Sequence, residues 1–288
     1  MVKRLLLLCG AFLCLTGCAL WPGGNRLPGY SAEDEAAVRA WKPRLWVAYY
    51  PYEQRDERPD GARPVPDYTG WTDNRMALDV RRIRECGGDG VAVALAPKQL
   101  ASSDVLERLA HFASVADEAG LRLCLLLHQR TAQVPLVLDG DNLVRYLQQA
   151  SLTDLPTFAR GESLLLLYDR GTIRLEGTLT ASSAIAVRPV NLRESAVEDA
   201  FPVLRIGENG GCLRTERRAQ RDEWPVPRLQ GRELLRQLRE AAETGAAEVL
   251  LQSWNCYRDG SFAEPNALDG DTMALILRRL FADFTADE

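Results

Sequence analysis

The sequence has few histidines, no closely paired cysteines and no excess of positive charge. Only His111 and His128 occur among its 288 residues, so a histidine-rich metal centre is not expected. No cysteine pair has the CxxC spacing of zinc or redox sites. The formal net charge of -5 provides no basic face for nucleic acid. We therefore expect no metal, no cofactor and no nucleic-acid partner.

The sequence also has no apolar run long enough to span a membrane, and the run that comes nearest to this length lies at the amino terminus. The apolar run at residues 5–15 is too short to span a bilayer, and two basic residues precede it. Leu15-Thr16-Gly17-Cys18 follows, so the segment resembles a bacterial signal peptide that ends in a lipobox. This resemblance implies that Cys18 is lipidated and anchors the protein to a membrane. The residue after the cysteine is Ala19 and not Asp, which in such lipoproteins implies delivery to the outer membrane.

Three segments are expected along the chain. Residues 1–17 are the predicted signal peptide, and residues 18–42, which contain Pro-Gly pairs and an acidic patch, are the predicted tether. Residues 43–288 suit one large domain with a sizeable core. Its four cysteines are far apart in sequence, so no pairing can be predicted for Cys86, Cys124, Cys212 and Cys256.

From Arg44 onward, short apolar runs alternate with amphipathic helical patterns, which is typical of βα units and a largely parallel sheet. The apolarity within each run is continuous, so both faces of these strands should be covered. The expected strands are 45–50, 90–96, 121–128, 163–168, 184–190 and 247–254. The expected helices contain the apolar stripes of residues 76–83, 105–116, 234–242 and 273–284. Residues 171–227 show only one faint helix. We therefore predict an α/β fold, a (β/α)8 TIM-type barrel that is incomplete or distorted in its second half.

In such a barrel the reacting groups lie just after the strands. Aromatic, amide and acidic side chains are found there, and aromatic rings beside polar groups suit sugars. We predict that the substrate-binding residues are Tyr49, Tyr50, His128, Tyr168, Trp254, Asn255, Tyr257 and Arg258. The tyrosines have an alternative interpretation, in which they only fill the barrel mouth. For His128 the alternative is a half-buried, hydrogen-bonded residue with a structural role.

Three stretches of the chain resemble glycoside hydrolase families 99 and 71. They are WVAYYPY at 46–52, RRIRECGGDGVAVAL at 81–95 and VLLQSWNCYRDGSFAEP at 249–265, and residues 146–171 fit the same order. The last stretch matches the family segment SWNEW-EGT-IEP. The resemblance implies a (β/α)8 barrel that acts on α-linked polysaccharide of the mannan or glucan kind.

Two glutamates of that last segment perform catalysis in family 99, one as a base toward the sugar 2-hydroxyl and one as acid and base at the glycosidic oxygen. Here the first position is Cys256 and the second is Asp259. A thiol with a pKa near 8.5 does not simply replace a carboxylate. Asp259 is then the expected acid, and a glycosidase would need a second carboxylate. Its candidates are Glu264, Asp169, Glu208 and Asp89.

Two functions remain open. The first is a divergent glycosidase, and the second is a catalytically inactive lipoprotein that binds glycan in polysaccharide uptake or export. The residue at position 256 discriminates between them, because the family base is absent there. A nucleophilic Cys256 would need a base such as His128 nearby. A third possibility is an envelope scaffold without a ligand.

Overall fold

The computed structural model describes residues 27, 30–51, 63–68, 70–129, 134–149, 164–176, 185–192, 201–207, 228–257 and 260–282. Within these ranges, seven strands form one sheet in the order β7-β5-β3-β2-β1-β9-β8. All neighbouring strands of this sheet are parallel. The strands are β1 (Arg44–Tyr49), β2 (Gly90–Leu95), β3 (Arg122–Leu127), β5 (Leu164–Asp169), β7 (Ile185–Val190), β8 (Val203–Arg205) and β9 (Glu248–Gln252). The six strands expected from the apolar runs are confirmed.

The two edge strands of this sheet meet at one point. Val190, at the end of β7, forms a parallel bridge with Phe201, which precedes β8. The Phe201 N–H donates to the Pro189 carbonyl at 2.9 Å. The described part of the sheet is thus a curled barrel wall of seven strands, and β8 beside the seam has only three residues. This confirms the prediction of a (β/α)8-type barrel that is incomplete in its second half.

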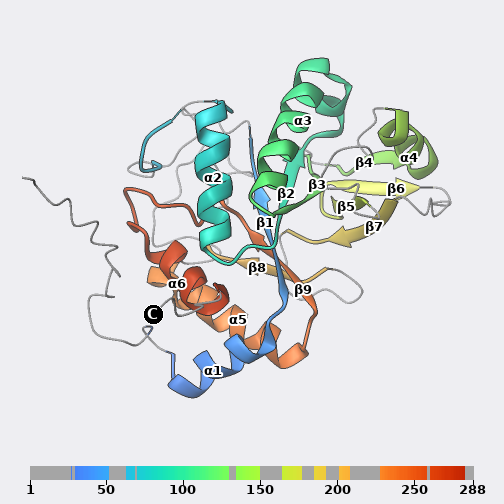
Figure 1. The fold of residues 1–288 in the computed structure, drawn as a ribbon. Coiled ribbons are helices and arrows are strands. Elements are labelled where there is room, and N and C mark those ends of the chain that lie inside the picture. Colours follow the sequence, from blue (N-terminus) through green and yellow to red (C-terminus); the bar gives the residue numbers. More distant parts are fainter. Residues whose placement is uncertain are drawn as a thin grey trace, which may run out of the picture.

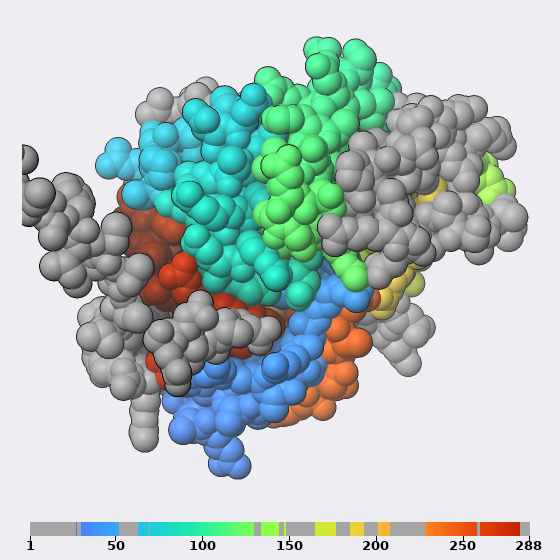
Figure 2. Space-filling model, in the orientation of Figure 1, coloured from blue at the N-terminus to red at the C-terminus, as the bar shows by residue number. Residues whose placement is uncertain are grey.

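Helices cover the outer face of the sheet (Figure 1). α2 (Asp73–Glu85) and α3 (Ser103–Glu118) lie side by side and form the continuous cyan and green surface of Figure 2. α1 (Ala32–Trp41) packs against both α5 (Arg232–Thr244) and α6 (Thr272–Phe281). The remaining helices are α4 (Gly140–Gln149) and the short 3-10 helices η2 (Pro97–Ala101) and η6 (Leu229–Gly231).

Local signals set the ends of these helices. The Thr72 hydroxyl accepts the Arg75 N–H, so the cap of α2 is Thr72 and not Asp73, which lies in the first turn. α5 ends at Gly245, whose φ of 65° lies in the left-handed region that glycine adopts without strain.

Residues 32–41, which the sequence places in the tether, form α1. Ser31 and Asp34 make a reciprocal capping box at its start. Val38 is buried, and the Trp41 indole N–H donates to the Ala246 carbonyl at 2.7 Å. This part of the chain therefore packs against the barrel helices. The predicted signal peptide and the start of the tether, with Cys18, lie outside the described residues.

Side chains of each strand alternate between the inside of the barrel and its outer face. Ala48 on β1 and Tyr50 directly after it point inward, whereas Val47 and Tyr49 belong to the outer core beneath the helices. We call the inward set the lumen cluster. It consists of Trp46, Ala48, Tyr50, Ala92, Ala94, Cys124, Leu126, Leu167, Val190, Leu192, Phe201, Val203, Leu250 and Cys256. Coverage of both faces explains the continuous apolarity of the strands.

Two small sheets flank the barrel. β4 (Leu136–Asp139) pairs with β6 (Ile173–Glu176), and β10 (Asn255–Cys256) forms a hairpin with β11 (Ser261–Phe262) directly after β9. Among the described cysteines, Cys86, Cys124 and Cys256 are free thiols. No group of potential metal ligands occurs among the described residues, and none of their helices is long and apolar enough to cross a membrane.

Candidate functional site

Five side chains that face the lumen lie at the carboxyl-terminal rim of the barrel. Tyr50 and His128 directly follow β1 and β3, Asp169 and Gln252 end β5 and β9, and Cys256 lies in β10. Tyr50 and Cys256 belong to the lumen cluster. The other three share the inward faces of Leu126, Leu167 and Leu250, because side chains two residues apart on a strand point the same way. We call Tyr50, His128, Asp169, Gln252 and Cys256 the mouth.

His128 and Asp169 form a hydrogen-bonded pair at the mouth. His128 Nδ1 lies 3.0 Å from Asp169 Oδ2. The same oxygen accepts the Thr172 hydroxyl at 2.8 Å, and Oδ1 accepts the N–H groups of Gly171 and Leu192 at 3.2 and 3.3 Å. Both carboxylate oxygens are therefore occupied, and Asp169 holds the histidine ring in place.

The ionised form of Asp169 is favoured in this arrangement. Burial alone would raise the pKa of Asp169, but the hydrogen bond and charge of His128, with the bonds from Thr172 and Leu192, lower it below its ordinary value. An ionised carboxylate accepts a hydrogen bond from Nδ1–H in both forms of the ring. No described residue bonds to Nε2, which accepts a hydrogen bond when the ring is neutral and donates one when it is protonated.

Asn255 joins the hairpin to the end of β1. Its Oδ1 accepts the Tyr50 N–H at 2.8 Å, and its Nδ2 donates to the Tyr50 carbonyl at 3.1 Å. The Tyr50 ring makes an edge contact with His128 at 6.1 Å between centroids. Asn255 is completely buried. We therefore reassign Asn255 from substrate binding to positioning, and keep Tyr50 and His128 in the mouth.

Cys256 holds the position that the sequence resemblance aligns with the catalytic base of family 99. Its side chain is only 1% exposed and packs in the lumen cluster. Its backbone N–H donates to Ser253 Oγ at 2.9 Å, while that hydroxyl donates to the Ser261 carbonyl. The thiol is thus an almost buried, inward-facing group within an apolar surrounding.

Arg228 holds the hairpin that carries Cys256. Its guanidinium donates to the carbonyls of Gly260 and Phe262 at 2.8 and 2.7 Å, and to Asp269 at 2.7 Å. It also stacks over the Phe262 ring at 4.0 Å. This buried cation, from the segment before η6, thus ties the backbone at β11 to Asp269.

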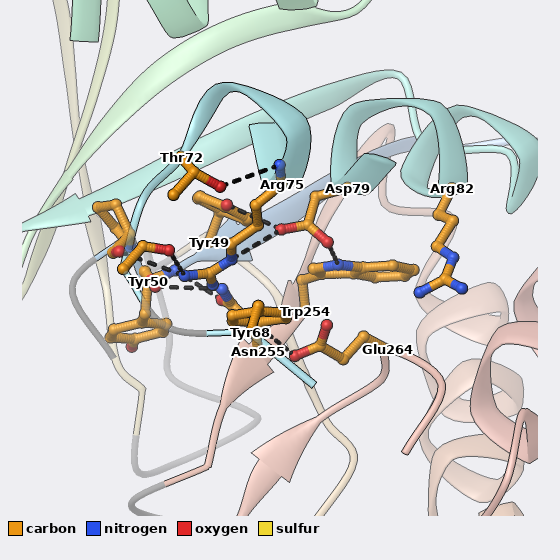
Figure 3. A network of polar contacts seen from close by, with 12 residues as sticks. Tyr49, Tyr50, Tyr68, Thr72, Arg75, Asp79, Arg82, Trp254, Asn255 and Glu264 are labelled. Atoms are coloured by element: carbon orange, nitrogen blue, oxygen red, sulfur yellow. Dashed lines mark hydrogen bonds and ion pairs between the residues drawn. The ribbon is translucent and has the colours of Figure 1, made fainter. Parts of the chain in front are cut away.

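A second polar network lies outside the lumen, between β1, α2 and the loop after β9 (Figure 3). Asp79 of α2 is its centre. It accepts the Tyr49 hydroxyl at 2.8 Å, the Arg75 Nε–H at 3.2 Å and the Trp254 indole N–H at 3.1 Å. Tyr49 and Trp254 are completely buried in this network. We therefore reassign both from substrate binding to this outer network.

Arg75 is enclosed by aromatic rings and carbonyls. Its guanidinium carbon lies 3.8 Å from the centroid of the Tyr68 ring and 5.5 Å from that of Tyr49. Its Nη1 donates to the Gly70 carbonyl at 2.9 Å. The charge of Arg75 is thus balanced mainly by Asp79.

Glu264 belongs to the outer network as well. It is completely buried, and its Oε1 accepts the Tyr68 hydroxyl at 2.5 Å. Burial and the negative charge of Asp79 raise the pKa of Glu264 to about 8, although the bonds from Tyr68 and Tyr257 oppose this. The proposed role of Glu264 as the second catalytic carboxylate does not fit this position, because the side chain faces away from the lumen.

Tyr168 and Tyr257 do not join the mouth. Tyr168 packs against the outer core. Tyr257 is buried and stacks on Phe262 at 4.4 Å between centroids. Arg258, Asp259 and Glu208 lie outside the described residues, so their predicted roles stay predictions.

Gln252 is a member of the mouth that we did not predict. The signal for it in the sequence is the alternation of Glu248, Leu250 and Gln252, which puts all three on one face of β9. The alternation does not say whether this face of β9 points into the lumen or toward the outer helices, so the sequence alone could not place Gln252 at the mouth. The side chain is 4% exposed, and its Oε1 is buried without a hydrogen-bond partner.

The opposite end of the barrel has a hollow of about 980 Å³ between the starts of β1 and β9 and the ends of α2 and α6. Its acidic groups are already paired. Glu248 contacts Arg44 at 3.0 Å and Arg188 at 2.8 Å, and the Asp89 carboxylate accepts the Leu45 N–H at 2.8 Å. Asp89 is therefore at the wrong rim to be a second catalytic carboxylate.

No protein-family profile and no curated protein matches the sequence. Several solved structures, in contrast, are similar to this chain in fold. The GH99 endo-α-mannosidase of Bacteroides thetaiotaomicron in complex with bis-tris propane has 13% identity and a TM-score of 0.60, covering 82% of this chain and 95% of that chain. A second structure of that enzyme gives 0.61, with 83% and 96% covered. A protein described as glycoside hydrolase-like gives 0.55 at 13% identity, with 90% and 97% covered. The fold is thus that of GH99 enzymes, as the resemblance in sequence implied.

Proposed function

We propose that this protein binds a glycan of the α-mannan or α-glucan kind at the mouth of its barrel. The observation that carries this proposal is the mouth itself. An aromatic ring, a histidine fixed by a buried carboxylate and a glutamine with an unused acceptor converge at the catalytic rim of a GH99-type barrel. Aromatic faces beside hydrogen-bonding groups suit sugars.

Binding fits the described residues better than the two-glutamate mechanism of the family. The base position holds the buried thiol of Cys256. Glu264 lies in the outer network, and both oxygens of Asp169 are occupied. No described residue of the mouth therefore offers a free carboxylate, whereas a glycosidase normally uses two.

Replacing His128 by Asn is expected to weaken binding of α-mannan or α-glucan oligosaccharides about tenfold. An asparagine can still donate to Asp169 in place of Nδ1, but it has no group at the position of Nε2. Isothermal titration calorimetry is the suitable measurement, because Trp254 lies in the outer network and is not expected to report on the mouth.

The matched control is His111→Asn. His111 is the other histidine, lies on α3 and is half-exposed, so its substitution should leave affinity unchanged. Wild-type protein that binds neither class of oligosaccharide would refute the proposed function. Equal affinities for wild type and His128→Asn would remove His128 from the mouth.

A second candidate, hydrolysis, is favoured by the pair of His128 and Asp169. This pair could take the proton of an attacking water at Nε2, with Asp259 protonating the leaving oxygen. Release of reducing ends by wild type and its loss in Asp259→Asn would support this candidate over binding alone.

We further propose that the chain is a lipoprotein, anchored through Cys18 in the outer membrane. The support is the signal-like segment with its lipobox at residues 15–18. In bacterial cells, Cys18→Ser should move the protein out of the outer-membrane fraction, because one cysteine carries all the acyl chains. Retention of the variant in that fraction would contradict the lipid anchor, and Cys86→Ser is the control.

A further inference from the structure

Three small side chains belong to the lumen wall near Gln252. Ala48 lies on β1 one residue beyond Val47, which is aligned with Leu251 of β9, and Ala92 and Ala94 lie on β2. Barrels usually fill this space with bulky branched residues. On β2, and at Ala48 between Trp46 and Tyr50 on β1, the inward side chains are therefore smaller than is usual in such barrels.

Gln252 brings an unused acceptor to this wall. Its Oε1 is buried and has no hydrogen-bond partner among the residues that the structure describes. A buried acceptor without a partner is unfavourable, and most such groups in native proteins are paired. At a ligand-binding rim, a ligand can supply the missing donor.

Gln237 provides the contrast within the same chain. It is 4% exposed, as Gln252 is. Its Oε1 accepts the Arg205 N–H at 2.6 Å, and its Nε2 donates to the Arg205 carbonyl at 2.9 Å and to Glu233 at 2.7 Å. A buried glutamine with a structural role in this protein is thus fully bonded, and Gln252 is not.

We propose that Gln252 is a ligand-contacting residue whose Oε1 accepts a hydrogen bond from a hydroxyl group of the bound sugar. This inference rests on the proposed glycan-binding function. When its ring is neutral, His128 offers a second acceptor, Nε2, at the same rim, so the two side chains together suit a ligand that presents donors. A neutral, hydroxyl-rich glycan meets this requirement. A sugar whose hydroxyl at that point is missing leaves Gln252 unpaired and is discriminated against.

The test is Gln252→Met, which keeps the length of the side chain and removes its polar group. We expect the variant to bind α-mannan or α-glucan oligosaccharides about fivefold more weakly than wild type. Its melting temperature without ligand should stay the same or rise, because an unpaired buried acceptor is lost. Gln237→Met, the matched control, should instead lower the melting temperature by about 3 °C or more.

The outcomes separate this inference from the function on which it rests. Wild type that binds no oligosaccharide overturns both. Wild type that binds, with equal affinity in Gln252→Met, overturns only the role of Gln252. A melting temperature that falls as far in Gln252→Met as in Gln237→Met shows a structural glutamine and also overturns the inference. Gln252→Leu serves in the same way if the methionine variant does not fold.

Discussion

Wild-type protein is expected to lose up to about 4 kcal/mol of its free energy of unfolding when the pH rises from 5 to 8, and Glu264→Gln is expected to lose far less. The reason is the outer network, where Asp79 and Glu264 share the single guanidinium of Arg75. Asp79 contacts Arg75 directly and accepts three hydrogen bonds. Burial raises the pKa of Asp79 as well, but the charge of Arg75 and these three hydrogen bonds oppose it, so Asp79 carries the negative charge and Glu264 keeps its proton.

The direction of this pH dependence follows from proton binding. In the unfolded chain, Glu264 loses its proton near its ordinary pKa of 4.5, whereas in the folded protein it keeps the proton up to about pH 8. Between these values the folded state binds more protons, so stability falls as the pH rises. The contribution of Glu264 to the free energy of unfolding is complete below about pH 4.5. It is lost as the pH rises toward and through the pKa of about 8 that Glu264 has in the folded protein.

Urea unfolding at several pH values measures this effect. Glutamine resembles the protonated acid in shape but does not titrate, so the variant should have a flat profile over the same range. Glu107→Gln, an exposed residue of α3, should keep the wild-type profile. Wild-type stability that is equal at pH 5 and pH 8 would show that Glu264 is ionised in the fold.

Asp79→Asn is expected to lower the free energy of unfolding by about 3 to 5 kcal/mol at pH 5. At that pH Glu264 is protonated in the wild type, so the substitution removes the ionised partner of Arg75, and only ionisation of the buried Glu264 could replace it. The asparagine amide would also place N–H donors against the donors of Arg75 and Tyr49. A buried charge that loses its partner is among the most destabilising changes in proteins.

The control for this prediction lies at the first residue of the same helix. Asp73 is 69% exposed and pairs with Arg108 at 2.6 Å. Exposed pairs contribute about 0 to 1 kcal/mol, so Asp73→Asn should cause only a small loss. A loss of less than 1 kcal/mol for Asp79→Asn in urea unfolding would mean that Arg75 is solvated or differently paired.

The outer network also determines the shape of the mouth. Tyr49, bonded to Asp79, directly precedes Tyr50, and Trp254, bonded to the same carboxylate, directly precedes Asn255, which holds the Tyr50 backbone. Residues outside the lumen thus fix their neighbours inside it. Variants of Asp79 should therefore be compared with wild type under conditions where both are folded.

The sequence by itself determined the elements of this fold and their order. Apolar runs located six strands, and apolar stripes of helical spacing located the main helices. The weak helical pattern after Gly171 predicted a barrel that is incomplete in its second half. These signals are local, because the periods of strands and helices and the apolarity of buried segments are properties of neighbouring residues. The late segment with Cys256 was also recognisable from its residues alone.

Only the tertiary structure decided which residues reach the mouth. Strands covered on both faces are apolar throughout, so nothing in the run that ends in Tyr49 and Tyr50 says which tyrosine faces the lumen. The pair of His128 and Asp169 joins residues 41 positions apart, and Trp254 meets Asp79 across 175. Such contacts depend on the curvature of the sheet and on the packing of α2, which bring together side chains that no local pattern relates.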